Sequence, residues 1–214
     1  MIYIVKHKEY NNPVPDGHKE LGVGDMFKGS GENINNLNYY INEATAYYDL
    51  WKNCKDPIKG ICHYRRFFAE NGEIIKISRV EEILTDNEMI AAEPFVSTAS
   101  LYRMLKADLA PGYEMQLFHK YLDLFYEAEP GFDIYMHKEK SFYQREMMIA
   151  KEETFNEFCE GLFEVVIPLA EKYHKEDSGS KTNPRLLGFI TERFFSYWII
   201  KNGYKVYPME FINI

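Results

Sequence analysis

The stretch Ile58-Lys59-Gly60-Ile61-Cys62-His63-Tyr64-Arg65-Arg66-Phe67-Phe68 joins an apolar run to a cluster of cations and aromatic rings. The run from Ile58 to Cys62 has the composition of a buried strand. Cations at the end of a buried strand lose hydration and need an anionic partner. Ligands of open α/β sheets bind beyond the carboxyl ends of strands, so Arg65 and Arg66 predict a phosphate or carboxylate site. Alternatively, one arginine pairs with a structural Asp or Glu while the other lies in solvent.

The segments before this stretch predict a sheet with a crossover. Ile2-Tyr3-Ile4-Val5 is β-branched and aromatic, which is typical of a buried strand, and the turn formers at 11–17 end it. Apolar side chains recur at helical spacing from Leu37 to Trp51 and predict one amphipathic helix. The order strand, long loop, helix, strand predicts parallel pairing of 2–5 with 58–62.

The rest of the chain alternates between the same two patterns. We expect strands at 89–92, 147–150 and 204–207, and helices at 101–109, 113–128, from Thr154, from Pro184, and at 78–84 with Ser78 as its cap. Pro168 should kink or restart its helix, and the polar stretch 172–183 predicts a flexible loop. The sequence contains no internal repeat and no segment whose amino-acid composition differs clearly from the rest. The sequence therefore predicts one α/β domain over residues 1–214, with helices around the sheet.

Composition narrows the function classes. The 214 residues carry a net charge of −8, which disfavours a nucleic-acid surface. The 17 Tyr and 15 Phe suit sugar or base stacking, and they equally suit an aromatic core. No apolar stretch reaches the ~20 residues of a membrane span, and no signal peptide opens the chain. We expect a cytoplasmic protein, with peripheral association at the inner face of the membrane left open.

The cysteines predict a reducing compartment. Cys54, Cys62 and Cys159 make an odd number and no disulfide framework. Cys54, Cys62 and His63 lack the spacing of zinc ligands, so we expect no structural metal. Neither a Gly-x-Ser-x-Gly elbow nor a recognisable Cys/His pair is present.

The Asp-x-Asp motif of many nucleotide-sugar transferases, which binds a divalent ion, is also absent. A sugar-nucleotide enzyme with this sequence would need side-chain cations for its diphosphate, and His63, Arg65, Arg66 and Lys6 could supply them. One Asp or Glu with water can still hold magnesium, so magnesium or manganese stays open as a cofactor.

Inverting glycosyl transfer also needs a carboxylate that accepts the proton of the acceptor hydroxyl. Glu192, Asp25 and Glu43 are the candidates. Glu192 could instead be a salt-bridge residue on a helix surface, and Arg193 should reach it only indirectly because successive helical residues do not face each other. Glu43 could lie at a helix rim, and Asp25 lies in a glycine-rich loop.

Several motifs together resemble a family of bacterial glycosyltransferases from capsular and exopolysaccharide loci, long catalogued as a domain of unknown function. The matching segments span nearly the whole chain: 3–7, 21–25, 31–34, 42–48, 51–53, 60–67 and the closing Gly188-Phe189-Ile190-Thr191-Glu192-Arg193. The block His63 to Phe67 and the preceding Glu43-x-Thr45-Ala46 are the most specific parts. One departure is Glu146, which precedes Met147 where relatives usually carry Asn, and this puts the sugar-contacting role of that strand in doubt.

The resemblance implies a GT-A-like fold with a mainly parallel central sheet and an inverting, galactofuranosyltransferase-like activity. It implies a nucleotide-diphosphate sugar as donor, with a UDP-sugar expected, and a glycan or lipid-linked oligosaccharide as acceptor. On these motifs we expect donor binding by Lys6, His7, Asn33, His63, Tyr64, Arg65, Arg66 and Arg193. Two rival interpretations are a non-catalytic sugar-nucleotide-binding or assembly protein, and a phosphotransferase that releases a nucleoside monophosphate.

Overall fold

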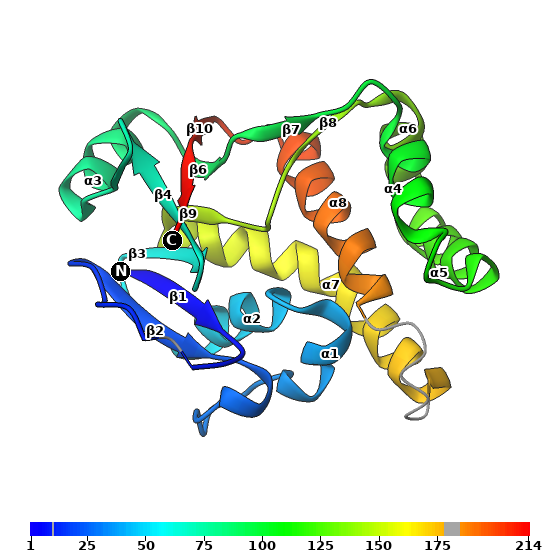
Figure 1. Ribbon diagram of the computed structural model, residues 1–214, viewed down its shortest axis with the longest axis horizontal. Coiled ribbons are helices and arrows are strands. Elements are labelled where there is room, and N and C mark those ends of the chain that lie inside the picture. The colour runs from blue at the N-terminus through cyan, green and yellow to red at the C-terminus, as the bar shows by residue number, and fades with distance from the viewer. Residues whose placement is uncertain (10, 178–184) are drawn as a thin grey trace.

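The computed structural model describes residues 1–9, 11–177 and 185–214, and it shows strands and helices alternating along the chain (Figure 1). The strands are β1 (Ile2–Lys6), β2 (His18–Gly22), β3 (Ile58–His63), β4 (Arg66–Glu70), β5 (Glu73–Ile74), β6 (Met89–Ala92), β7 (Pro94–Val96), β8 (Ser141–Tyr143), β9 (Met148–Lys151), β10 (Val206–Met209) and β11 (Phe211–Asn213). The α-helices are α1 (Asn38–Ile41), α2 (Ala44–Asn53), α3 (Ile77–Asp86), α4 (Leu101–Leu109), α5 (Met115–Ala128), α6 (Pro130–Lys138), α7 (Glu152–Asp177) and α8 (Leu186–Lys201), and two short 3-10 helices are η1 (Gly24–Met26) and η2 (Asn35–Leu37).

The central sheet runs in the order β10-β6-β9-β3-β1-β2. β1 is parallel to both β2 and β3, and β10 is parallel to β6, whereas β9 lies antiparallel between β6 and β3. The prediction of parallel pairing between 2–5 and 58–62 is confirmed, with Ile2 opposite Gly60 and Tyr3 opposite Ile61. Because parallel neighbours end at the same edge of a sheet, the residues that follow β1 and β3 lie together.

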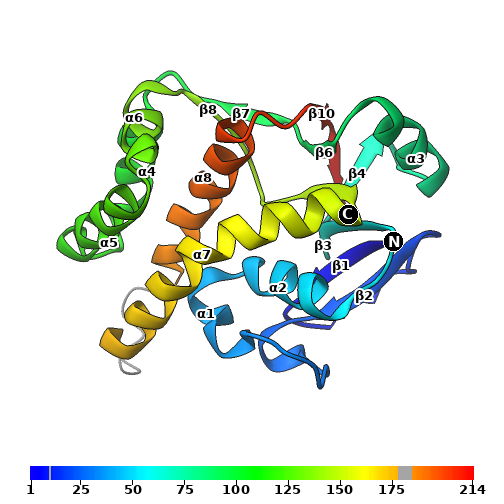
Figure 2. The same ribbon diagram turned by 180° about the vertical axis from the view of Figure 1, so that it is seen from behind.

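The sheet is mainly parallel and is flanked by helices, as predicted. Tyr3, Val5 and Ile61 belong to the large core that packs against α2, α7 and α8, while Ile2 and Ile4 belong to a smaller core with α3. Burial on both faces explains why these strands are apolar throughout rather than alternating. Figures 1 and 2 show α4, α5 and α6 grouped beyond α8, on the side away from β1 and β2.

Two helices differ from their prediction: one has a break in its interior, and the other lacks the predicted N-terminal cap. The expected helix 37–51 is broken at Asn42, which has a left-handed φ of 48° and separates α1 from α2. Asn tolerates this conformation better than most residues, and here Thr45 Oγ1 donates to the Asn42 carbonyl at 2.8 Å. Ser78 is not a helix cap, because α3 begins at Ile77 after an extended Lys76 and no side chain caps it.

One helix continues through a proline and covers part of the polar segment, and another helix begins at a proline. Pro168 lies inside α7 and does not restart it, and α7 extends to Asp177, so residues 172–177 are helical rather than a loop. Pro130 is the first residue of helix α6, which was not among the predicted helices, and a missing N–H costs little at this position. Residues 178–183 of the expected loop and the expected helix start at Pro184 lie outside the described residues.

Gly188 sets how closely α8 approaches the break between α1 and α2. A Cβ at Gly188 would overlap the amide of Asn42 and lie 3.1 Å from the Tyr40 carbonyl oxygen. We expect Gly188→Ala to lower the free energy of unfolding by about 1–3 kcal/mol, because overpacking displaces neighbours. Chemical denaturation measures this. Gly112→Ala is the matched control, since a Cβ there meets no atom within 4 Å. Equal losses for the two variants would contradict the prediction.

Candidate active site

Two adjoining cavities lie beyond the carboxyl ends of β1 and β3. The first, the arginine cavity, has a volume of about 250 Å³ and is lined by His7, Asn42, Glu43, His63, Tyr64, Arg65, Arg66, Arg145, Glu146, Arg185, Gly188, Phe189 and Glu192. The second, the asparagine cavity, has a volume of about 670 Å³ and is lined by Val5, His7, Val23, Gly24, Asp25, Asn35, Asn36, Asn38, Tyr39, Tyr40, Asn42, Glu43, His174 and Arg185. Their four shared residues make them parts of one site.

A tight hairpin brings Arg65 and Arg66 into the arginine cavity together. β3 turns into the antiparallel β4 through Tyr64 and Arg65, with His63 paired to Arg66. Side chains at a turn do not alternate as they do along an extended strand, and both arginines line the arginine cavity. The Arg65 guanidinium lies 4.9 Å from the centre of the Tyr64 ring. Burial, and then the nearby Arg145 and Arg65, lower the pKa of Arg66.

Arg145 and Arg185 complete a group of four arginines in this cavity, of which the sequence motifs contain only Arg65 and Arg66. Both have left-handed backbones, with φ of 71° and 65°. Arg185 Nε donates to Asn42 Oδ1 at 3.0 Å. Throughout the described residues, the ion pairs formed by arginine involve Arg79 and Arg193, so none of these four has a carboxylate partner. Unpaired cations gathered in one cavity repel each other, and an anionic ligand relieves that repulsion.

Of the three carboxyl groups in the arginine cavity, Glu43 and Glu192 have partners. Glu43 Oε1 lies 3.4 Å from His63 Nδ1. Glu192 Oε1 accepts from the Arg145 backbone N–H at 2.7 Å, and Oε2 accepts from Arg193 Nη1 at 2.5 Å. The prediction that Arg193 reaches Glu192 only indirectly is wrong, because its long side chain folds back to the preceding residue.

Glu146 is the third carboxyl group and is buried, with 5% of its surface exposed. Its Oε1 has no hydrogen-bond partner. Burial is the main reason that its pKa is raised well above the usual value, and Glu43 and Glu192 raise it further. Burial therefore favours the uncharged form of this carboxyl group.

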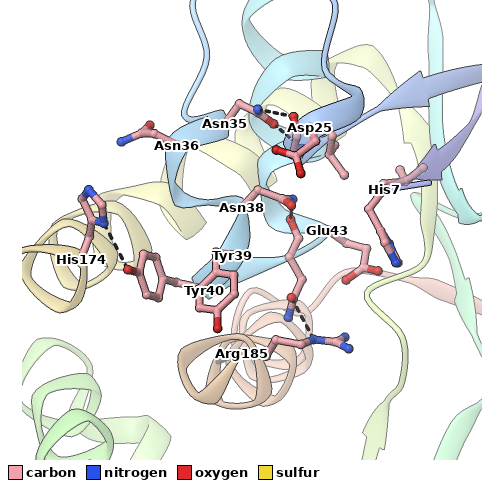
Figure 3. A pocket seen from close by; sticks show the side chains of 14 residues that line it. His7, Asp25, Asn35, Asn36, Asn38, Tyr39, Tyr40, Glu43, His174 and Arg185 are labelled. Atoms are coloured by element: carbon pink, nitrogen blue, oxygen red, sulfur yellow. Dashed lines mark hydrogen bonds between the residues drawn. The ribbon is translucent and has the colours of Figure 1, made fainter. Parts of the chain in front are cut away.

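The asparagine cavity offers amide and aromatic groups (Figure 3). Asn35 binds the backbone of Gly24 twice, accepting from its N–H at 2.7 Å and donating to its carbonyl at 2.8 Å. His174 Nδ1 lies 3.3 Å from the hydroxyl of Tyr40. Asp25 lines this cavity rather than the arginine cavity. A space of this size with amides and phenols suits a planar base and a ribose.

A third cavity of about 270 Å³ adjoins the arginine cavity through Arg145, Phe189 and Glu192, and we name it the aromatic cavity. Its wall is formed mainly by apolar side chains, including Phe95, Met104, Leu105, Leu109, Tyr113 and Phe142. The Arg193 guanidinium, which lines it, lies 4.4 Å from the centre of the Phe142 ring.

The residues predicted from the sequence divide into those that line the first two cavities and those that do not. His7, Glu43, His63, Tyr64, Arg65, Arg66 and Glu192 line the arginine cavity. Lys6 instead forms an ion pair with Glu20 at 2.8 Å, and Asn33 donates to the Gly31 carbonyl at 2.9 Å within its own loop. Neither lines these two cavities. The sequence carried a signal for Arg145, which lies among polar residues at the start of a strand, but none for Arg185.

No group of three or more His, Cys, Asp and Glu side chains within the described ranges is placed to hold a metal ion. Across residues 1–9, 11–177 and 185–214, none of the helices combines the length and the hydropathy of a membrane span.

Comparison with known proteins places the chain in a family. No curated protein sequence matches it. Among solved structures it is similar to the apo structure of the bifunctional glycosyltransferase WbbM, with a TM-score of 0.73 and 18% identity. The match covers 100% of this chain and 45% of the WbbM chain, so this chain spans less than half of that protein. At this identity the likeness shows the fold alone. Residues 1–203 match the family DUF4422, described as a domain of unknown function, and the chain therefore belongs to that family.

Proposed function

We propose that this protein is a glycosyltransferase, which moves a sugar from a nucleotide-diphosphate donor to a hydroxyl of a glycan or lipid-linked acceptor. The observation that carries the proposal is the group of four arginines that have no carboxylate partner within the described part of the chain, located where a nucleoside-sized cavity meets a cavity lined by carboxyl groups. The likeness to a bifunctional glycosyltransferase supports it.

In the proposed complex, the nucleoside occupies the asparagine cavity and the diphosphate lies against Arg65, Arg66, Arg145 and Arg185. When the bond between sugar and phosphate breaks, negative charge grows on the departing diphosphate. Fixed guanidinium groups stabilise that charge without having to reorganise. The carboxyl groups of the arginine cavity do not fit a divalent cation well, because both oxygens of Glu192 are hydrogen-bonded and burial favours the uncharged form of Glu146. The mechanism therefore has no step through a metal.

Glu43 is the proposed base of an inverting reaction. It lies at the junction of the two donor cavities, whereas Glu192 is occupied by Arg145 and Arg193, and Asp25 lies in the asparagine cavity. Among the described residues no arginine forms an ion pair with Glu43, whose charged contact is His63, so its carboxylate is left to act on a hydroxyl in the arginine cavity. It can accept the proton of the attacking hydroxyl.

The acceptor is proposed to enter through the aromatic cavity. Aromatic faces such as Phe189 and Tyr113 can pack against the C–H faces of sugar rings, and this cavity reaches the arginine cavity at Glu192. The finer parts of the proposal follow the sequence motifs. They are a GT-A-type domain over residues 1–214, a UDP-sugar donor, galactofuranosyl transfer, a role in capsular or exopolysaccharide synthesis, and a location in the cytoplasm at or near the inner membrane face.

Slow donor hydrolysis without acceptor tests this function. We expect the protein to release a nucleoside diphosphate from one member of a panel of UDP-, GDP- and dTDP-sugars, assayed with and without manganese. The Arg65→Ala/Arg66→Ala double variant should not release it. Release of a nucleoside monophosphate would indicate the phosphotransferase. Binding without any turnover, including with glycan acceptors, would indicate the non-catalytic binding protein.

A further inference from the structure

This inference rests on the proposed donor site, where an ionised Glu146 would repel the bound diphosphate. A cavity that binds a diphosphate would be expected to keep carboxylates away from it, yet three carboxyl groups line this one. Glu192 is hydrogen-bonded to Arg193, and Glu43 lies beside His63. Among the described residues, Glu146 forms no ion pair, and its buried Oε1 has no hydrogen-bond partner. A proton on Glu146 removes this repulsion, because an uncharged carboxyl group does not repel phosphate.

The backbone holds Glu146 in this position. Arg145 and Glu146 are consecutive left-handed residues, with φ of 71° and 49°. Such conformations cost on the order of 1–3 kcal/mol each and persist only where neighbours enforce them. Here His63 Nε2 donates to the Arg145 carbonyl at 2.6 Å, and Tyr47 donates to the Glu146 carbonyl at 2.7 Å.

A third contact completes this arrangement, since the Arg145 N–H donates to Glu192. Side chains from β3, α2 and α8 thus fix one bend at the wall of the arginine cavity. We name residues 145–146 the carboxyl bend. The bend presents Glu146 to the cavity while its Oε1 stays buried.

The charges around Glu146 come from each element packed against the bend. The β3–β4 hairpin contributes His63, Arg65 and Arg66, and the start of α2 contributes Glu43. α8 contributes Glu192 and Arg193, and Arg185 precedes it. His7 follows β1. Burial has the largest effect on the pKa of Glu146 and raises it, Glu43 and Glu192 also raise it, and Arg185 and Arg193 oppose them in part.

We propose that Glu146 takes part in donor binding as an uncharged carboxyl group, which donates a hydrogen bond to an oxygen of the bound diphosphate. A protonated carboxyl has one O–H donor, and phosphate oxygens only accept. The ionised form would lose that donor and add a like charge. Donor binding is therefore linked to the proton on Glu146.

Calorimetric titration with pyrophosphate and with UDP, from pH 6 to 9, tests the link. Above the pKa of Glu146, the Kd of the wild type should rise by up to about tenfold for each pH unit. Glu146→Gln keeps an uncharged donor of the same length, so its Kd should lack this rise. Glu146→Ala removes the donor and should bind about tenfold more weakly at pH 6.

The comparison with Glu146→Gln isolates one group, because the two proteins differ only in this side chain and bind the same ligand. The same pH dependence in wild type and Glu146→Gln would overturn the inference. So would an affinity of Glu146→Gln at pH 6 as poor as that of Glu146→Ala. If neither pyrophosphate nor UDP binds the wild type at any pH, the proposed donor site itself is wrong, which is a distinct result.

The pH dependence of stability, measured without ligand, is a second test of whether Glu146 is protonated in the folded protein. A carboxyl whose pKa is raised by folding holds more protons in the folded than in the unfolded state, from its unfolded pKa of about 4.3 up to its folded value. The free energy of unfolding then falls as pH rises through this window. Relative to Glu146→Gln, the wild type should lose Tm as pH increases. Glu164→Gln, at an exposed position on α7, should follow the wild type. Parallel curves for wild type and Glu146→Gln would show that Glu146 is ionised and would overturn the inference.

Discussion

Replacing Arg65 and Arg66 together with Ala should raise the Kd for UDP or a UDP-sugar by at least about 100-fold. Each hydrogen bond from a charged group contributes about 1.5–3 kcal/mol, and both side chains line the arginine cavity. Each single variant should also weaken binding, because the turn at Tyr64 and Arg65 directs both guanidinium groups to the same space. Isothermal titration calorimetry at fixed ionic strength measures the three affinities.

Arg103→Ala is the matched control for this loss. Arg103 is exposed on α4, and none of the three cavities includes it. Its removal changes the net charge by the same amount as either single variant, so it should bind UDP as the wild type does. Unchanged affinity in the double variant would exclude Arg65 and Arg66 from the diphosphate site.

Glu43→Gln should lower kcat for transfer or donor hydrolysis by about 10²–10⁴-fold, the usual contribution of a general base. The Kd for UDP should change little, because the amide keeps the size of the carboxylate and the arginines are untouched. Steady-state kinetics and calorimetry on the same protein separate the two effects. A purely structural role of Glu43 would not lower kcat while leaving the Kd for UDP unchanged.

Two comparisons make the Glu43 experiment decisive. Glu127→Gln removes an exposed carboxylate from α5 and should leave kcat unchanged. Glu192→Gln and Asp25→Asn test the other two candidates in the same assay. If one of them loses as much kcat as predicted for Glu43 while Glu43→Gln stays active, that residue is the base.

Local sequence patterns predicted the framework of the site. The apolar runs at 2–5 and 58–62 and the crossover between them identified β1, β3 and their parallel pairing, which the structure confirms. The end of a strand near His63 also followed from sequence, because the apolar run that predicts the strand stops there. An apolar run is a pattern of residues that are close together in the sequence. It can therefore be recognised without knowledge of the tertiary structure.

The errors concern positions at which distant residues determine the backbone. The hairpin at Tyr64 and Arg65 depends on β4, which pairs with β11 near the far end of the chain. The break at Asn42 accompanies the close approach of Gly188 on α8. An amphipathic stripe continues across such a break, so periodicity predicts one helix where the structure has two.

The sequence by itself determined the α/β class, the parallel core strands and the strand end at which cations gather. Only the tertiary structure decided that Arg65 and Arg66 face one cavity, that Arg145 and Arg185 join them, and that Glu146 is buried among them. The reason is physical. Arg145, Glu146 and Arg185 occupy left-handed conformations, which their own residue types disfavour. Residues that are distant in sequence, among them His63 and Tyr47, hold the carboxyl bend in place.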